Sequence, residues 1–420
     1  MHVGKFLRCA SCALTLIASC ASAQQRADES PQQIFERAIE ERSRGDLHEA
    51  IRSFQTLLER NPALNRARIE LAVAYYHSLN HRAALEQARL VLADPATPPA
   101  VRANLERLIA QIEAEAAPHR FDGNASLGWI YDSNVSAGPS STTYEAGGGV
   151  SAVDPNAARR ADSGLLVALG GSHRWLSPMR PGIGGRDGAL LWQSQALFNR
   201  LTYRHENDYD LQVITLATGP AWISPPKLRA ALPLQFDRMD LGYDHYLDIL
   251  GTSPSVVFGG PAGTELQVDA LLQRRAYRRD SERGRDSRYR SAGLQVGRVI
   301  ARLTLQGGLR YSRDDAEDAH WDYHGSEWFA LLAGTFAERG SAFLRYTRMH
   351  FDYDQPDPVA LAGRTDGERR WSIGAAWRVA GTSQQPWSLG LAFLDVSHGS
   401  TVPFYAFDRQ QWSATLSGAF

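Results

Sequence analysis

Apolar residues recur at every second position in many segments after Phe121. The clearest segment alternates apolar residues with small, polar or charged ones, in the order Trp371, Ser372, Ile373, Gly374, Ala375, Ala376, Trp377, Arg378 and Val379. This two-residue period is that of a β-strand with one apolar face and one more polar face. An edge strand of a soluble sheet has the same pattern, so the number and length of such segments decide between a soluble sheet and a membrane barrel.

About fourteen segments of this kind follow one another. They begin near Asn124, Gly164, Leu190, Leu211, Leu228, Tyr246, Glu265, Tyr289, Arg302, Glu327, Ser341, Arg369, Trp387 and Gln410. Each is close to the roughly 9–11 residues that a tilted membrane-spanning strand needs. An even number of strands brings both ends of a barrel to the same side of the membrane. The sequence therefore predicts a transmembrane antiparallel β-barrel of about 14 strands over residues 121–420.

The connections between these segments alternate in length. Ser224–Lys227 and Glu338–Gly340 are short, whereas Asn134–Ala161 and Asp354–Gly367 are long. Short turns in the periplasm and long loops outside the cell are the pattern of outer-membrane barrels. The turn Leu176–Gly188 is an exception, because it is long for a periplasmic one.

The last segment keeps its apolar side up to the final residue, through Trp412, Leu416 and Phe420. Terminal residues of soluble domains fray unless something holds them in place, so this regular period favours the final strand of a barrel. The three residues resemble the C-terminal signature that the outer-membrane barrel assembly machinery reads. That machinery and outer-membrane lipid are therefore expected partners.

Residues 30–117 have the period of α-helices and nearly repeat themselves. Ala38 and Ala72, for example, are 34 residues apart. A 34-residue period with small residues inside a helix pair is typical of tetratricopeptide repeats. The stretch "PPAVRANLERLIAQIEAEAA" then predicts a capping helix that begins at its prolines. We expect a short α-helical, tetratricopeptide-like domain in front of the strands.

Repeats of this type present one concave face to partners. The register of the repeat points two sets of residues into that face: Phe35, Ile39, Arg42, Ile69, Val73, Tyr76 and His77. These are the candidate partner-binding residues. The alternative is that the same residues pack between the helices, or, for His77, that the side chain is a solvated helix residue.

Residues 1–23 have the layout of a secretory signal peptide. Lys5 and Arg8 precede a weakly polar run and then "ASA" before Gln24. The alternative is a bacterial lipobox, "IASC", in which Cys20 would be acylated and become the mature N-terminus. Both predict export. All 3 cysteines lie in this segment, so we expect no disulfide and no thiolate metal site in the mature chain.

Composition and motifs argue against several other classes of protein. The 45 Lys and Arg residues nearly balance the 46 Asp and Glu residues, which removes the electrostatic case for nucleic-acid binding. No cofactor motif is found, and the acidic run Asp237–Asp248, which lacks the spacing of a calcium loop, predicts a solvated loop. We expect no enzymatic activity. The alternative is an outer-membrane phospholipase, in which a serine would act with His173, His324 or His398.

The stretches Arg68–Glu113 and Gly123–Pro139 resemble the surface lipoprotein assembly modulator family, known as Slam. The family's "RIELA", "PPAVRANLERLI" and "YDSNV" elements occur here at Arg68–Ala72, Pro98–Ile109 and Tyr131–Val135. The resemblance covers nearly the whole mature chain. It implies a periplasmic helical domain joined to a fourteen-stranded outer-membrane barrel, although the front domain here is shorter than in many members.

The resemblance also implies a function. The helical domain would receive an exported client, and the barrel would help the client to reach the cell surface, with no bond made or broken and no cofactor. Clients of the family are surface lipoproteins and some secreted haem- or metal-capturing proteins. One alternative is an exopolysaccharide export porin, which usually has many more repeats. Another is a small-solute porin, which does not need a helical domain.

Overall fold

A computed structural model describes residues 29–146, 149–155, 157–183, 186–225, 227–382 and 385–420. The predicted signal peptide, residues 1–23, and the alternative acylation site Cys20 lie outside the described residues. The chain divides into two compact units. One comprises the chain up to Ala117 together with Pro181–Ala189, and the other comprises Pro118–Arg180 and Leu190–Phe420.

Most of the first unit is built from helices. Its described helices are α2 (Pro31–Ser43), α3 (Leu47–Arg60), α4 (Asn65–His77), α5 (His81–Leu92) and α6 (Pro99–Glu115). At the start of α2, the hydroxyl of Ser30 accepts a hydrogen bond from the Gln33 backbone, and the Gln33 side chain accepts one from the Ser30 backbone. This capping box satisfies two backbone N–H groups that a helix start leaves unpaired. Gly45, with φ of 76°, lets the chain reverse between α2 and α3.

Small residues at the repeat positions let the helices approach closely. Ala38, Ala50, Ala72 and Ala84 are each fully buried. Larger apolar residues fill the rest of two cores, one of which includes Ile34, Phe54, Leu57 and Leu71 and the other Ala72, Val91 and Leu105. The predicted capping helix is α6, in which Leu105 and Ile112 are buried. Among the described residues, no helix is long and apolar enough to cross a lipid bilayer.

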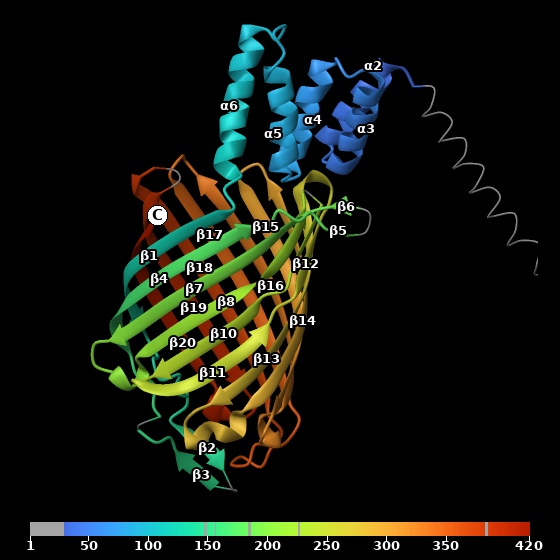
Figure 1. Cartoon of the computed structure of the whole chain (residues 1–420). Helices are drawn as coiled ribbons and strands as arrows, with labels where there is room; N and C mark the ends of the chain where they lie inside the picture. Colours follow the sequence, from blue (N-terminus) through green and yellow to red (C-terminus); the bar gives the residue numbers. More distant parts are fainter. Residues whose placement is uncertain (1–28, 147–148, 156, 184–185, 226, 383–384) are drawn as a thin grey trace, which may run out of the picture. The chain divides into compact units, whose positions relative to one another are not determined.

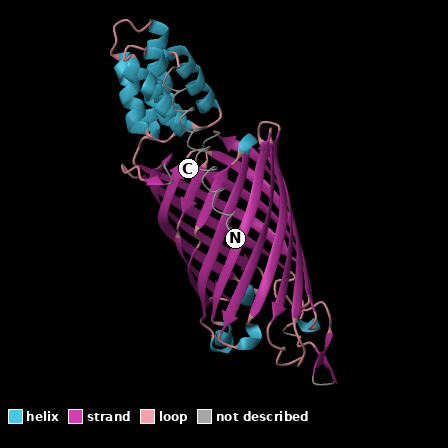
Figure 2. Cartoon of the chain, turned by 90° about the vertical axis from the view of Figure 1, so that its right-hand side faces the viewer, coloured by secondary structure: helices cyan, strands magenta, loops and turns pink. Residues whose placement is uncertain are grey.

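The second unit is an antiparallel sheet that closes into a barrel (Figures 1 and 2). Its described strands are β1 (His119–Asp132), β4 (Asp162–Leu176), β7 (Ala189–Tyr203), β8 (Leu211–Ser224), β9 (Leu228–Ala231), β10 (Leu234–Leu241), β11 (Asp244–Thr252), β12 (Ser255–Gly259), β13 (Thr264–Tyr277), β14 (Ser287–Ile300), β15 (Leu303–Ala316), β16 (Tyr323–Phe336), β17 (Gly340–Tyr353), β18 (Thr365–Gly381), β19 (Pro386–Ser400) and β20 (Phe407–Ala419).

Within the described residues, these 16 segments make fourteen barrel strands, because two of the strands are interrupted. β9 and β10 both pair with β8, and β11 and β12 both pair with β13. The breaks fall at Pro233 and Pro254, which have no N–H to donate to the sheet. Pairing of β1 with β20, from Asn124↔Ala419 to Asp132↔Gln411, closes the barrel. The predicted fold, a helical domain followed by a barrel of about 14 strands, is confirmed.

The strands are longer than the sequence suggested. Uninterrupted strands have from 13 to 17 residues, because polar end segments that were expected to be loops continue the sheet. The acidic run Asp237–Asp248 is the clearest correction. It is not a solvated loop, since most of it belongs to β10 and β11, joined by a tight turn at Gly242 and Tyr243.

The two faces of the sheet differ as the alternation predicts. On β1 and β20, Leu127 pairs with Leu416 and both side chains are exposed on the outside. Ser126 and Ser417, one position away, face inward, where their hydroxyls are 2.8 Å apart. Large apolar side chains cover the outer face elsewhere, including Leu165, Leu169, Leu294, Val296, Leu305, Leu309, Ile373, Trp377, Leu389 and Leu391. Such an apolar outer face is what a transmembrane barrel presents to lipid.

Connections at one end of the barrel are mostly short, and those at the end where β1 finishes carry additional structure. The longer loops contain the hairpin β2 (Thr143–Ala146) and β3 (Gly149–Ala152) and the 3₁₀ turns η1 (Asn207–Tyr209), η3 (Asp280–Arg285), η4 (Ala319–Trp321) and η5 (Pro403–Tyr405). At the other end lies η2 (Pro261–Gly263), and the chain between β4 and β7 forms the small hairpin of β5 (Gly182–Ile183) and β6 (Arg186–Asp187). The β5–β6 hairpin accounts for the unusual length of the turn that follows β4. We call the end with the longer loops the loop end.

Candidate functional site

The predicted partner-binding residues of α2 lie against α4. Phe35 is half-buried, with its ring edge-on to Phe54 at 6.0 Å between centroids. The guanidinium of Arg66 lies 4.9 Å from the centre of the Phe35 ring. Arg42 forms a 3.1 Å ion pair with Glu70 of α4, and Ile39 packs against the helix core. This side of α2 is therefore partly occupied by α4.

The predicted partner-binding residues of α4 differ in burial and in contacts. Ile69 packs against the core around Leu105, and Val73 is half-buried. The hydroxyl of Tyr76 donates to Glu115 at 2.8 Å and accepts from Gln111 at 2.7 Å. Both of these partners belong to α6.

Burial and the hydrogen bond to Glu115 raise the pKa of the Tyr76 hydroxyl above its ordinary value. His77 is exposed, with its ring 5.3 Å from that of Tyr76. The face thus combines both sequence interpretations, since Ile39 and Ile69 pack between helices while Tyr76 and His77 carry polar groups at the surface. Sequence reasoning missed Arg66, Glu70, Gln111 and Glu115, because their partners lie on other helices.

The "YDSNV" element fastens the first strand to the last at the loop end. Asp132 is fully buried, and its carboxylate accepts hydrogen bonds from Arg409 Nε at 2.9 Å, Gln411 at 2.7 Å and Tyr203 at 3.0 Å. Asn134, also fully buried, donates to the backbone carbonyl of Asp408 at 3.0 Å. Side chains therefore join β1, β7 and β20 where the barrel closes. We call Asp132, Asn134, Tyr203, Arg409 and Gln411 the closure cluster.

Of the three residues predicted as an assembly signal, Trp412 and Leu416 lie on the outer face of β20, and Phe420 directly follows that strand. All three side chains are exposed, as the alternation predicts. Phe420 also exchanges two backbone hydrogen bonds with Gly123, which sits near the other end of β1. Recognition of these residues by assembly machinery stays a prediction.

The inner face of the barrel carries ion pairs and amide ladders between neighbouring strands. Arg310 pairs with Asp269 at 2.5 Å and donates to Ser291 at 2.8 Å. The Gln306 amide donates to Gln295 at 2.9 Å, and Gln295 in turn donates to Asp269 at 3.2 Å. The bonds to the Asp269 carboxylate are charge-assisted and therefore stronger than the neutral bond between Gln306 and Gln295. The wall they line is polar, as the interior of many membrane-spanning barrels is.

A second arginine cluster ties several loops together at the loop end. Arg364, 8% exposed, lies 3.4 Å from the ring centre of Tyr405, 4.2 Å from that of Tyr353 and 5.7 Å from that of Trp321. It also pairs with Asp366 at 2.6 Å. These residues come from the connections β15–β16, β17–β18 and β19–β20 and the adjoining strand ends. Cation–π and ionic contacts therefore hold three loops as one body.

Tyr405 and Asp357 extend this cluster into the loops. The Tyr405 hydroxyl donates to Asp357 at 2.8 Å. Burial, together with the hydrogen bond to Asp357, raises the pKa of Tyr405 to about 12. Burial alone would raise the pKa of Asp357, but hydrogen bonds from Ala360, Tyr405 and Val359 hold it below its ordinary value. We call Arg364, Tyr353, Trp321, Tyr405 and Asp357 the loop cluster.

The histidines considered for a phospholipase lie in three different places. His173 stacks on Phe121 at 4.5 Å on the outer face, and His324 contacts Asp354 at 3.2 Å. His398 contacts Glu368 at 2.9 Å. Among the described residues, no group of three or more His, Cys, Asp or Glu side chains is arranged to hold a metal ion.

No family model matches the chain, and no curated protein matches it. The chain is similar to several solved barrels. A Pseudomonas aeruginosa FadL homologue matches with a TM-score of 0.39 and 9% identity, over 72% of this chain and 90% of that one. Acinetobacter baumannii OccAB1 matches with 0.38 and 7%, over 72% and 97%, and Pseudomonas aeruginosa OprD with 0.36 and 9%, over 71% and 95%. At such low scores and identities, nothing known of these proteins carries over to the function of this chain.

Proposed function

We propose that this protein is an outer-membrane translocator that assists delivery of exported client proteins to the cell surface. The observation that carries the proposal is the junction between its two units. α6 ends at Glu115 and β1 begins at His119, so only a few residues separate a helical binding unit from a membrane barrel. A short tether keeps a captured ligand at high effective concentration near its destination.

The helical unit offers a site of suitable chemistry for capture. Phe35 of α2 and Tyr76 of α4 are half-buried aromatic side chains, and the Arg42–Glu70 ion pair joins the same two helices. Aromatic and arginine side chains are the residues that most often anchor protein partners. The client would be an exported lipoprotein or a secreted haem- or metal-capturing protein, and the helical unit would meet it in the periplasm.

Client capture by the purified full-length chain tests this proposal. The double variant Phe35→Ala with Tyr76→Ala is expected to weaken binding of a co-expressed lipoprotein by about 1–2 kcal/mol or more, which is typical of aromatic anchors. Leu90→Ala is the matched control, because Leu90 is an exposed apolar residue of α5, whereas all the predicted residues belong to α2 and α4. Equal binding by both variants would remove the predicted face from the mechanism.

A small-solute porin is the second candidate. The observation that favours it is the polar inner wall, with Arg310, Asp269, Gln295 and Gln306 in one connected network. Conductance across planar bilayers distinguishes the two functions. A porin gives steady channels from the purified chain alone, and Arg310→Ala changes their ion selectivity. A translocator whose barrel conducts no solute gives no such channels without a client.

A further inference from the structure

The outer face of the barrel has an apolar hollow beside the β1–β20 closure. Its volume is about 820 Å³, within the range of small-molecule pockets. Gly123, Gly171 and Ala196 form its floor, and they are direct cross-strand neighbours on β1, β4 and β7. A Cβ atom added to Gly171 would have no atom within 4 Å. The hollow therefore exists because β4 and β7 carry almost no side chain at this height, while on β1 the ring of Phe420 covers Gly123 and borders the space.

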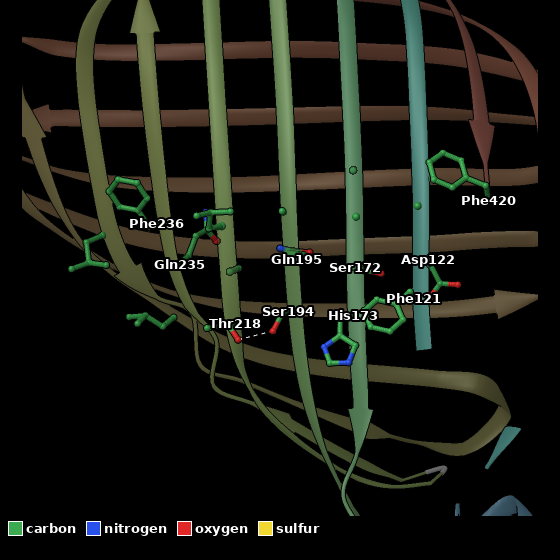
Figure 3. Close-up of a pocket in the computed structure, with 18 residues that line it drawn as sticks. Phe121, Asp122, Ser172, His173, Ser194, Gln195, Thr218, Gln235, Phe236 and Phe420 are labelled. Carbon is green, nitrogen blue, oxygen red and sulfur yellow. Dashed lines mark hydrogen bonds between the residues drawn. The ribbon is translucent and has the colours of Figure 1, made fainter. Parts of the chain in front are cut away.

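Large apolar side chains form the two walls of this hollow. Phe121 and Phe420 stand on one side, 74% and 68% exposed. Leu216, Phe236 and Leu250 stand on the other, on β8, β10 and β11. Figure 3 shows Phe236 and Phe420 at opposite sides of the strands between them. We call the space between these walls the outer groove.

The outer groove belongs to the apolar face of the sheet. Gly171 lies between Leu169, which is exposed on the outside, and His173, which stacks on the exposed ring of Phe121. The groove is thus continuous with the surface that a barrel turns toward lipid. Its natural occupant is a flexible apolar chain that is already present in the bilayer.

One end of the groove is polar. His119 Nδ1 lies 2.9 Å from His173 Nε2, and the two rings are stacked 5.2 Å apart. The hydroxyls of Ser194 and Thr218 are 2.7 Å apart, as the dashed line in Figure 3 shows. Trp192 Nε1 donates to Thr218 at 2.8 Å. Aromatic and polar groups at strand ends mark the level of lipid headgroups, and His119 is the first residue of β1.

We propose that the outer groove binds one phospholipid of the surrounding membrane, with an acyl chain between the aromatic walls and the phosphate beside His119 and His173. Imidazole N–H groups and hydroxyls donate hydrogen bonds to phosphate oxygens. A lipid held here contacts both strands of the barrel closure, because Phe121 belongs to β1 and Phe420 follows β20. Continuity with the lipid-facing surface favours a membrane phospholipid over the lipid anchor of a client.

Native mass spectrometry of the full-length chain tests this site. The protein is reconstituted in vesicles of phosphatidylethanolamine and phosphatidylglycerol and then released in mild detergent. We expect wild type to retain one phospholipid. Gly171→Leu fills the groove and is expected to lower retention at least five-fold. The matched control is Gly307→Leu, on the outer face of β15 between exposed Leu305 and Leu309, where the nearest atom to an added Cβ is 3.4 Å away; it is expected to retain the lipid.

Phe121→Ala is a second test of the groove, and it stays informative if Gly171→Leu fails to fold. This variant removes a wall that is mostly exposed, so the barrel is expected to fold while lipid retention falls at least three-fold. Heat-modifiable migration on a gel confirms that each variant is folded. Equal retention by wild type, Phe121→Ala and any folded Gly171→Leu would overturn the site, as would absence of retained lipid from wild type. Recovery of an acylated cysteine peptide instead of a phospholipid, after expression together with a client, would overturn the assignment of the ligand.

Discussion

Gly123 of β1 and Phe420, which follows β20, are joined by two backbone hydrogen bonds where the barrel closes. The Gly123 N–H donates to the Phe420 carbonyl at 2.7 Å, and the Phe420 N–H donates to the Gly123 carbonyl at 2.9 Å. The ring of Phe420 lies over the glycine, where an added Cβ would be 2.3 Å from the ring. Because Gly123 has no side chain, β1 leaves space for the ring of Phe420.

Loss of this ring should impair barrel formation. Phe420→Ala is expected to lower the folded fraction, measured by heat-modifiable migration after outer-membrane assembly. The ring is mostly exposed, so its contribution to stability after folding is small, about 1 kcal/mol, and the main loss is in assembly. Leu389→Ala, on the outer face of β19, is the control and should assemble normally. Equal folded fractions for the two variants would rule out a special role for Phe420.

The closure cluster should contribute most to stability at the loop end. Asp132→Ala leaves Arg409 without its main acceptor, and breaking a buried ion pair typically costs about 3–5 kcal/mol. Asp122→Ala removes the exposed pair with Arg120, and such pairs contribute about 0–1 kcal/mol. The temperature at which the barrel unfolds on a gel should therefore fall much more for Asp132→Ala. Similar temperatures for both variants would contradict the role given to the closure cluster.

The loop cluster should respond to alkaline pH. The folded state holds the pKa of Tyr405 at about 12, against an ordinary 10.0. Because the folded value is the higher one, the contribution of Tyr405 to stability is complete below pH 10 and is lost as the pH rises through about 12. Ultraviolet titration of phenolate should lose a step near pH 12 in Tyr405→Phe. If the step that Tyr405→Phe loses lies near pH 10 instead, the Tyr405 hydroxyl is solvated and the prediction is wrong.

Tyr76 should have separable structural and binding roles. Tyr76→Phe removes the hydrogen bonds to Glu115 and Gln111, at a cost of about 1 kcal/mol in stability of the helical unit, but keeps the ring. Tyr76→Ala removes the ring as well. If the ring anchors a client, Phe should retain most of the client affinity and Ala should lose it. Calorimetric unfolding and client binding, measured on the same variants, separate the two effects.

Sequence reasoning predicted the strands because their signal is local. The alternation around Trp371 or Leu305 depends only on neighbouring residues, and the structure places a strand at each predicted position. The same reasoning placed the acidic run Asp237–Asp248 in a loop, because polar residues at strand ends resemble loop residues. Pairing across β10 and β11 overrides that local preference.

The contacts of the candidate sites could not be predicted in the same way. The "YDSNV" element was visible in the sequence, but the partner of its Asp132 is Arg409, which lies 277 residues later in the chain. Arg364 meets Tyr405 across two connections. The outer groove depends on Gly123, Gly171 and Ala196 sharing one register. Such pairings follow from barrel closure, which fixes the register of every strand together.

Surface display of a lipoprotein client on intact cells tests the proposed translocation most directly. Display is followed by antibody binding and by protease access, with the full-length chain and with a chain that lacks residues 30–117 but keeps its export signal. We expect the full chain to raise display strongly and the shortened chain, although its barrel folds, to raise it much less. Equal display by the two chains would show that the helical unit is only a spacer and would contradict the proposed translocation mechanism.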